Sequence, residues 1–344
     1  MSKARLIAAA VGAALGIGAG LAQAKDQLVV NSFGGGYEKK HRELVIEPFE
    51  KLHDVEVVMV TAYSADTLAQ LRAQKENPKF DVVHLSGGLE ATAAAEGLLA
   101  PIQPSELTHH AEMYPYAVRN IEKGEGPAYS AAVIGILYDT EKVSPAPTSW
   151  KDLARPEFAG HLVLTDISNN WGLLSFLMIN KVAGGSLEDI APGLAAVKQM
   201  LGGATVVAKS PEIQQAFAQS GAWIAPYAQD YAFTLTKAGL PVKFVQPEEG
   251  AAFSPITVNL VAGTKKRDLA VKFIDFSLRA EASAGWAESF RYSPTNRNAK
   301  LSAEAAAGVI GSEEAARTLV SFDPIAIGKS RSAWTDEWNR AIAK

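Results

Sequence analysis

The stretch NSFGGGYEKK, residues 31–40, contains three consecutive glycines between an apolar, strand-like run and a charged, helix-like run. A glycine turn that leads into a helix presents backbone N–H groups, and the helix dipole favours an anion there. A dinucleotide site needs G-x-G-x-x-G and a P-loop needs lysine followed by serine or threonine, and this stretch has neither. The turn therefore predicts either close approach of the backbone to a solute or a purely structural tight turn.

The sequence contains no motif that is typical of covalent catalysis. There is no cysteine, no H-E-x-x-H and no G-x-S-x-G, so no motif supplies a nucleophile with its base. Glu248 and Glu249 form an acidic pair in a P-E-E-G turn, where we expect solvent contact. His109 and His110 stand at a polar helix start, where exposure is a simpler interpretation than metal binding. We expect no catalytic residues, no metal site and no cofactor.

The elements that position the glycine turn follow an alternating pattern. The runs QLVVNSF, VEVVMVTA and FDVVHLS are β-branched, and helical stretches at residues 38–52 and 65–75 separate them. This βαβ order is typical of an α/β domain with a mostly parallel sheet. Ligands bind beyond the carboxyl ends of such strands, where the turns 34–36 and 86–88 fall. The two turns therefore predict one edge of a cleft.

A second alternating series covers GHLVLTDISNNWG, two helices near residues 173–182 and 190–201, ATVVAKS and GAWIAPYAQDYAFTLTKAG. Apolar runs at 128–143 and 253–263 lie before and after this series. Two extended crossings between two α/β lobes form a hinge with a cleft between the lobes. We therefore predict lobe 1 from residues 25–132 and 257–300, and lobe 2 from 133–256 and 301–344.

The first 24 residues read as a secretory signal peptide. Lys3 and Arg5 precede an apolar run, and Ala22-Gln23-Ala24 forms an A-x-A cleavage site. We expect export to the periplasm and a soluble mature chain. At 48% hydrophobic and 20% charged residues, without cysteine, this chain needs an ordinary hydrophobic core instead of disulfides. The net charge of −4 includes no basic block, which argues against nucleic acid as a partner.

Several segments resemble one family. They are residues 31–57, GILYDTEKV, PTSWKDLARPEFAGHLVLTD, GLPVKFVQPEEGAAF and residues 270–296, and together they span nearly the whole mature chain. The sequence is similar to the periplasmic solute-binding proteins of ABC importers, in the branch with the spermidine/putrescine receptors and their ferric, thiamine and aminoethylphosphonate relatives. The resemblance implies a type II Venus flytrap: two α/β lobes close on a solute and dock on an inner-membrane ABC permease. It also implies a monomer.

The family pattern assigns a pocket to the two glycine turns, the loops 166–171 and 227–231, and the residues after the returning strand. The ligand-binding residues that the resemblance implies are Phe33, Gly35, Tyr37, Ser86, Trp171, Tyr227, Asp230, Tyr231, Ser254, Arg291 and Tyr292. We expect four of them to form the apolar walls: Phe33, Trp171, Tyr227 and Tyr231.

The acids of this implied pocket are few. Polyamine receptors hold ammonium groups with aromatic faces and several carboxylates. Here the first acidic loop of the family reads ISNNW, residues 167–171, and the stretch after the hinge reads SPI, residues 254–256. Asp230 remains, between two tyrosines, with a solvated acid or helix cap as its alternative role. One carboxylate suits one ammonium group.

Two cations are candidate partners for an anionic group at the other end of such a ligand. Lys209 precedes a helix that begins near Pro211, and Arg291 stands in the late binding segment. Either cation suits a carboxylate or phosphonate, together with Ser86, Ser254 and N–H groups of the Gly35 turn, although a solvated surface cation is the alternative for both. The sequence therefore predicts a receptor for a small amine-bearing solute, such as a polyamine-like or ω-amino-acid-like molecule. The alternatives are 2-aminoethylphosphonate, thiamine, ferric ion on tyrosines, or a ligand-sensing adaptor.

Overall fold

The computed structural model describes residues 25–343. The signal peptide predicted for residues 1–24 lies outside the described residues. None of the helices in this described part combines the length and the apolar character that crossing a membrane requires.

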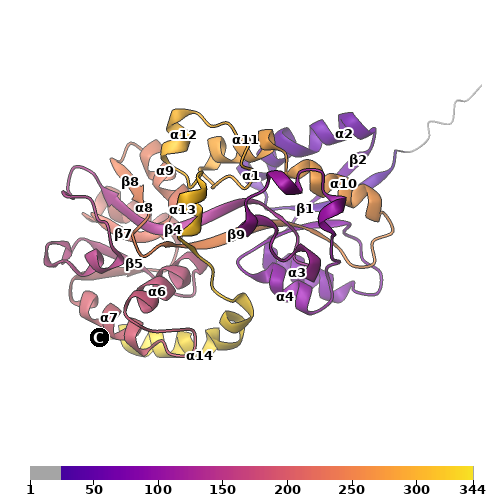
Figure 1. Ribbon diagram of the computed structural model, residues 1–344. Coiled ribbons are helices and arrows are strands. Elements are labelled where there is room, and N and C mark those ends of the chain that lie inside the picture. Colours follow the sequence, from indigo (N-terminus) through magenta and orange to yellow (C-terminus); the bar gives the residue numbers. More distant parts are fainter. Residues whose placement is uncertain (1–24, 344) are drawn as a thin grey trace, which may run out of the picture.

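Two long strands, β4 (Ala128–Asp139) and β9 (Ala251–Leu260), pair antiparallel and run between two groups of elements (Figure 1). Both consist almost entirely of buried residues, and the one charged residue, Asp139 at the end of β4, is half-buried. The prediction of two extended crossings is confirmed.

Lobe 1 lies on one side of this crossing. Its elements are β1 (Gln27–Ser32), α1 (Gly35–His41), α2 (Glu47–His53), β2 (Glu56–Thr61), α3 (Ser64–Ala73), β3 (Val82–Ser86), α4 (Leu89–Ala95), α5 (Pro115–Val118), α10 (Arg267–Ser277) and α11 (Ala280–Phe290). A π-helical segment, Arg42–Ile46, joins α1 to α2, so the predicted helical stretch 38–52 is continuous.

Lobe 2 lies on the other side. Its elements are β5 (Leu162–Thr165), α6 (Asn170–Val182), α7 (Ala191–Met200), β6 (Ala204–Val207), α8 (Ser210–Gln219), β7 (Ile224–Ala228), α9 (Gln229–Lys237) and β8 (Val242–Val245). The chain then returns through lobe 1 to α12 (Ala303–Ala307), α13 (Glu313–Arg317), β10 (Leu319–Val320) and α14 (Pro324–Ile342).

The strands form one mixed sheet in the order β2-β1-β3-β9-β4-β7-β5-β6, with β10 paired to β9 and β8 to β4. Pairing is parallel within each lobe, between β1 and β2 and between β5 and β6. It is antiparallel where β9 meets β3 and where β4 meets β7. The crossing strands therefore connect two parallel half-sheets.

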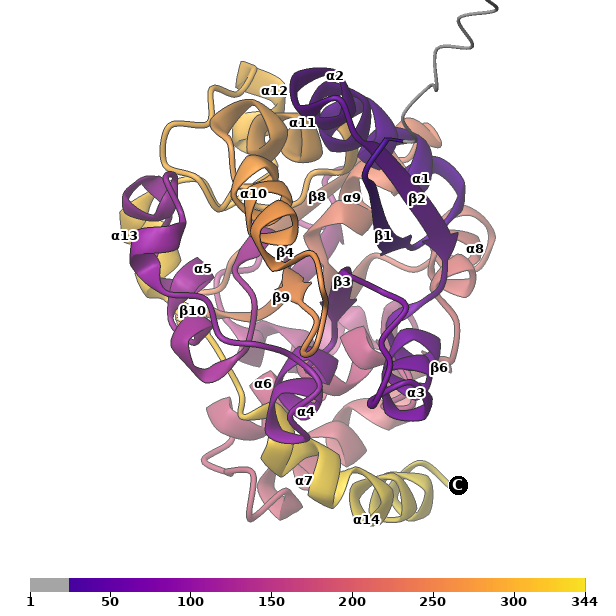
Figure 2. The same cartoon turned by 90° about the vertical axis from the view of Figure 1, so that its right-hand side faces the viewer.

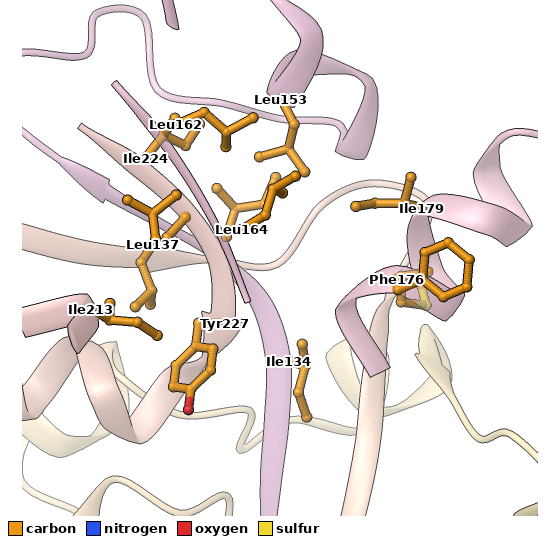
Figure 3. Close-up of a cluster of buried hydrophobic side chains, with 14 of the residues drawn as sticks. Ile134, Leu137, Leu153, Leu162, Leu164, Phe176, Ile179, Ile213, Ile224 and Tyr227 are labelled. Atoms are coloured by element: carbon orange, nitrogen blue, oxygen red, sulfur yellow. The ribbon is translucent and has the colours of Figure 1, made fainter. Parts of the chain in front are cut away.

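Each lobe has its own hydrophobic core. The lobe 2 core gathers Ile134 and Leu137 of β4, Phe176 of α6 and the aliphatic residues of β5 (Figure 3). Trp334 and Trp338 attach α14 to the same core. The lobe 1 core includes Tyr129, at the other end of β4. This division supports the predicted lobe boundaries near residues 132 and 256, which we retain as a proposal.

Candidate functional site

The glycine turn after β1 has a backbone that only glycine adopts without strain. Gly34 has φ +79° and Gly35 has φ +56°. A Cβ at Gly34 would lie 2.9 Å from the Thr61 methyl group, so the turn packs directly against the end of β2. Gly35 itself is exposed, with no atom within 4 Å of the position a Cβ would take. The turn leaves open space at the carboxyl end of β1.

Aromatic rings surround this turn. The ring of half-buried Phe33 lies parallel to that of Tyr63, with centroids 6.4 Å apart, and Tyr63 is 64% exposed. Tyr37 stacks on Trp286 at 4.6 Å and its hydroxyl bonds the Tyr129 hydroxyl, so the lobe 1 core holds it in place. Phe33 and Tyr63 therefore form the accessible aromatic surface of this lobe.

Two serines connect the next two strand ends. The N–H of Ser86, at the end of β3, donates to Oγ of Ser64 at 3.1 Å, and the two hydroxyls lie 3.3 Å apart. Ser64 begins α3 directly after β2. The sequence interpretation named Ser86 but missed Tyr63 and Ser64. Both lie just beyond a predicted strand, and this position could have identified them.

On the lobe 2 side, Asn169 organises the start of α6. Its Oδ1 accepts the N–H of Trp171 at 2.9 Å and of Gly172 at 3.4 Å, and its Nδ2 donates to the Tyr227 hydroxyl at 3.4 Å. Trp171 lies half-buried in the first helical turn. The stretch expected to be a loop to residue 171 is therefore helical from Asn170 onward, because Asn169 caps it.

Tyr227 and Tyr231 are joined through Ser210. The Tyr227 hydroxyl lies 2.6 Å from the Ser210 hydroxyl, and the Tyr231 hydroxyl donates to the Ser210 carbonyl at 2.5 Å. Burial raises the pKa of both tyrosines, that of Tyr231 to about 12. Both are therefore neutral phenols near pH 7 in the free protein. Among the described residues, no three His, Cys, Asp or Glu side chains form a metal-binding group.

Asp230 is the acidic group of this cluster. It lies in the first turn of α9, which begins at Gln229, and not in the loop expected from the sequence. Its Oδ1 is buried and has no hydrogen-bond partner among the described residues. Burial raises the pKa of Asp230 to about 7. Asp230 as a whole is half-buried, but a carboxylate oxygen that is buried without a partner is costly, and such groups concentrate at binding sites.

The charge of Asp230 affects the pKa values of residues from both lobes. Burial raises the pKa values of Tyr227 and Tyr231 from lobe 2 and of Tyr292 from the end of α11, and the negative charge of Asp230 raises each further. Tyr292 stacks on Phe290, with centroids 5.6 Å apart, and belongs to the lobe 1 core. The negative charge of Asp230 therefore acts on tyrosines of both lobes.

Three candidates lie elsewhere or have other partners. Arg291 is buried; its guanidinium donates to the carbonyls of Ala287 and Glu288 and to Glu304 at 2.6 Å. It stacks on Phe233 and is not brought to the Asp230 cluster. Lys209 is exposed before α8. Ser254 is buried on β9 and lines a cavity of about 70 Å³ together with Gly87 and Asn170, and the residues of the Asp230 cluster are not among those that line it.

The chain belongs to a known family: the model for the bacterial extracellular solute-binding proteins matches residues 77–317. The resemblance seen in the sequence is confirmed, and with it the two-lobed α/β fold. Proteins of this family bind solutes for ABC transporters outside the cytoplasm and are not enzymes.

Two curated relatives cover most of the chain. The spermidine/putrescine-binding periplasmic protein of Escherichia coli K12 is 26% identical over 74% of this chain and 75% of its own length. The gamma-aminobutyric acid-binding protein of Pseudomonas aeruginosa PAO1 is 27% identical over 81% and 80%. Among solved structures, an ABC transporter protein of Clostridium perfringens is 25% identical with a TM-score of 0.80, covering 92% of this chain and 99% of that chain.

Proposed function

We propose that this protein is the binding component of an ABC importer for a small zwitterion with one ammonium group, of the ω-amino-acid type. The observation that supports this choice is the single buried, unpartnered carboxylate oxygen of Asp230 among neutral phenols. One ammonium group supplies the missing partner and neutralises the charge, while ring faces of the neighbouring tyrosines favour a cation.

The anionic end of the solute would be met by neutral donors. With Arg291 bonded to Glu304, the hydroxyls of Ser64 and Ser86 and the N–H groups of the Gly35 turn are the donors at the strand ends of lobe 1. Exposed Tyr63, parallel to Phe33, offers a face to the methylene chain. Preformed donors of this kind fix the orientation of a small solute at little entropic cost.

The relatives support the same range of ligands, since one is named for gamma-aminobutyric acid and another for polyamines. A polyamine needs several carboxylates, and the positions at 167–171 and 254–256 supply none. The inner-membrane permease, the monomeric state and the cleaved signal peptide are further parts of this proposal that stay predictions.

Calorimetric titration of the mature chain, from residue 25, tests the assignment. The ligands are 4-aminobutanoate, 2-aminoethylphosphonate, spermidine, thiamine and ferric ion. We expect 4-aminobutanoate to bind, and Asp230→Asn to weaken it at least about 30-fold, because losing one partner of a buried charge pair costs about 2 kcal/mol or more.

The matched control is Asp268→Asn. Asp268 is also the second residue of a helix, α10, but is exposed, so this variant should bind like the wild type. Unchanged affinity in Asp230→Asn would remove Asp230 from the site. Binding of spermidine or ferric ion alone would overturn the zwitterion proposal.

A further inference from the structure

Another cavity, of about 270 Å³, lies where α9 and β8 of lobe 2 meet α12. Figure 1 and Figure 2 show α12 beside α11, where the Ser302 hydroxyl donates to the Glu288 carboxylate at 2.9 Å. The α9 residues that line the cavity share one face of that helix, and they are Gln229, Ala232, Phe233 and Thr236. Asp230 and Tyr231 project from other faces of α9 and do not line it. The cavity is therefore separate from the Asp230 cluster.

Most of the wall of this cavity is apolar. Phe233 of α9 and Phe244 of β8 contribute aromatic rings, and Ala232, Val242 and Ala307 contribute aliphatic carbons. Pockets for small molecules commonly start near about 300 Å³ and combine an apolar wall with a few polar groups. The cavity therefore suits a small molecule with an apolar body.

Arg291 is the buried cation of this wall. The residue is 5% exposed, and its guanidinium lies 4.0 Å from the centre of the Phe233 ring. Nη1 donates to the carbonyls of Ala287 and Glu288, and Nη2 donates to Glu304 at 2.6 Å. The Nε–H has no acceptor among residues 25–343. The Nε–Nη2 edge, which can bind a carboxylate through two parallel hydrogen bonds, therefore forms only one.

Glu304 is an exposed partner for this buried guanidinium. It is the second residue of the five-residue helix α12, and its side chain is 79% exposed. Holding a long, exposed side chain in one position costs conformational entropy, which offsets much of the gain from the ion pair. Another carboxylate can therefore replace Glu304 at small cost. Two cations, Arg291 and Lys243, and one carboxylate, Glu304, give the lining a formal charge of +1 when all are ionised, which favours an anion.

Gln229 contributes an unused acceptor to the same wall. Its Nε2 donates to the Arg291 carbonyl at 2.6 Å and to the Ser293 hydroxyl at 2.9 Å, and these two bonds fix the orientation of the amide. Its Oε1 is buried and has no hydrogen-bond partner among the described residues. Buried polar atoms are seldom left without a partner, so this oxygen is a second indication, separate from the guanidinium, that the wall receives an occupant.

We propose that this cavity binds a small monocarboxylate with an apolar body, such as an aliphatic or aromatic acid. The carboxylate forms two hydrogen bonds with the Nε–Nη2 edge of Arg291 in place of Glu304. The apolar body lies against the rings of Phe233 and Phe244. The proposal does not rest on the proposed function, because Asp230 does not line this cavity.

Fluorine NMR titration of the mature chain at pH 7.5 and constant ionic strength tests the site. The probes are 4-fluorobenzoate and 6-fluorohexanoate, and the comparison probe is 4-fluorobenzyl alcohol, which has the same ring but no charge. We expect saturable binding of at least one of the two acids, and weaker binding of the alcohol by tenfold or more. The absence of saturable binding for both acids would overturn the proposal.

Two variants test the ion pair. Glu304→Gln removes the competing carboxylate, so the affinity for the acid should rise threefold or more. Arg291→Lys keeps the charge but loses the planar pair of donors, so the affinity should fall tenfold or more. The matched control is Glu314→Gln, because Glu314 is also the second residue of a five-residue helix, α13, and is exposed outside the cavity. This control should bind the acid like the wild type.

A second pair of variants locates the bound acid, even if Arg291→Lys does not fold. Ala307→Phe fills the cavity from an exposed position on α12 and should abolish binding, whereas Ala306→Phe changes an exposed neighbour outside the lining and should not. Asp230→Asn should bind the acid like the wild type, which separates this site from the zwitterion site. Loss of acid binding in Asp230→Asn, or wild-type affinity in both Glu304→Gln and Ala307→Phe, would overturn the proposal.

Discussion

At the residue scale, Asp230 and Glu90 share a physical property. Each has a buried oxygen without a partner, and burial raises the pKa of each to about 7. Folding therefore proceeds against the cost of burying them, as is common where a protein prepares a site for a charged ligand.

The pKa of Asp230 predicts that amine binding depends on pH. A cation pairs with the carboxylate, and in the free protein that form is lost as pH falls through about 7. The affinity for 4-aminobutanoate should therefore be constant above pH 8 and fall up to tenfold per pH unit below about 6.5. Titrations at pH 5.5, 6.5, 7.5 and 8.5 measure this profile. A pH-independent affinity in the wild type would contradict the pairing, and residual binding in Asp230→Asn should lack the slope.

At the element scale, one cap positions the start of α6. Asn169 satisfies two helix N–H groups and holds the Tyr227 hydroxyl, so Trp171 and the phenol are oriented by the same side chain.

Replacing this cap should therefore affect both stability and binding. Asn169→Ala should lower the free energy of unfolding by about 1 kcal/mol, the usual cost of losing an N-cap. Asn169→Asp keeps the accepting oxygen and should restore most of that stability, but not the bond donated to Tyr227. Urea unfolding measures the first effect and titration with 4-aminobutanoate the second. If both variants unfold like the wild type, the cap does not stabilise α6.

Secondary-structure elements were the part of this structure that the sequence predicted best. Alternating patterns located the strands and helices of both lobes, because each pattern is local and repeats. Tyr63 and Ser64 lie beyond a strand that was predicted, so attention to each strand end would have found them. The position of Glu90 could not be found in this way, since Ser254 and Pro324, which line the same cavity, are far away in the chain. Likewise, Arg291 looked available because its partner Glu304 lies in a different helix.

At the scale of the whole molecule, buried titratable groups have opposite effects on how stability changes with pH. His41 and His84 are buried in lobe 1, with ring centroids 4.4 Å apart. Burial lowers the pKa of both, that of His84 to about 4. In the unfolded chain histidine binds a proton near pH 6.5, so this pair destabilises the fold as pH falls from 6.5 towards 4. Asp230 and Glu90, whose pKa values are raised, act in the opposite direction over that range.

Comparison of variants separates these contributions. His84→Gln removes a group that lowers the free energy of unfolding by on the order of 3 kcal/mol when pH falls from 7.5 to 4.5. The free energy of unfolding of this variant, relative to the wild type, should therefore rise by a few kcal/mol as pH is lowered over that range. Urea denaturation at pH 7.5, 6.0 and 4.5 measures it, with a change at the half-buried His110, His110→Gln, as the control outside this pair. A pH-independent difference would mean that His84 titrates alike in both states.

The six tryptophans are distributed unequally between core and site. Trp150, Trp286, Trp334 and Trp338 are buried, and half-buried Trp223 stacks on His161 at 3.5 Å. Trp171 is half-buried at the start of α6, beside the Asn169 cap. The protein therefore contains its own optical probe. We therefore expect changes in tryptophan emission on ligand binding, without unfolding, to originate in Trp171 more than in the core tryptophans, and Trp171→Phe should remove most of that change.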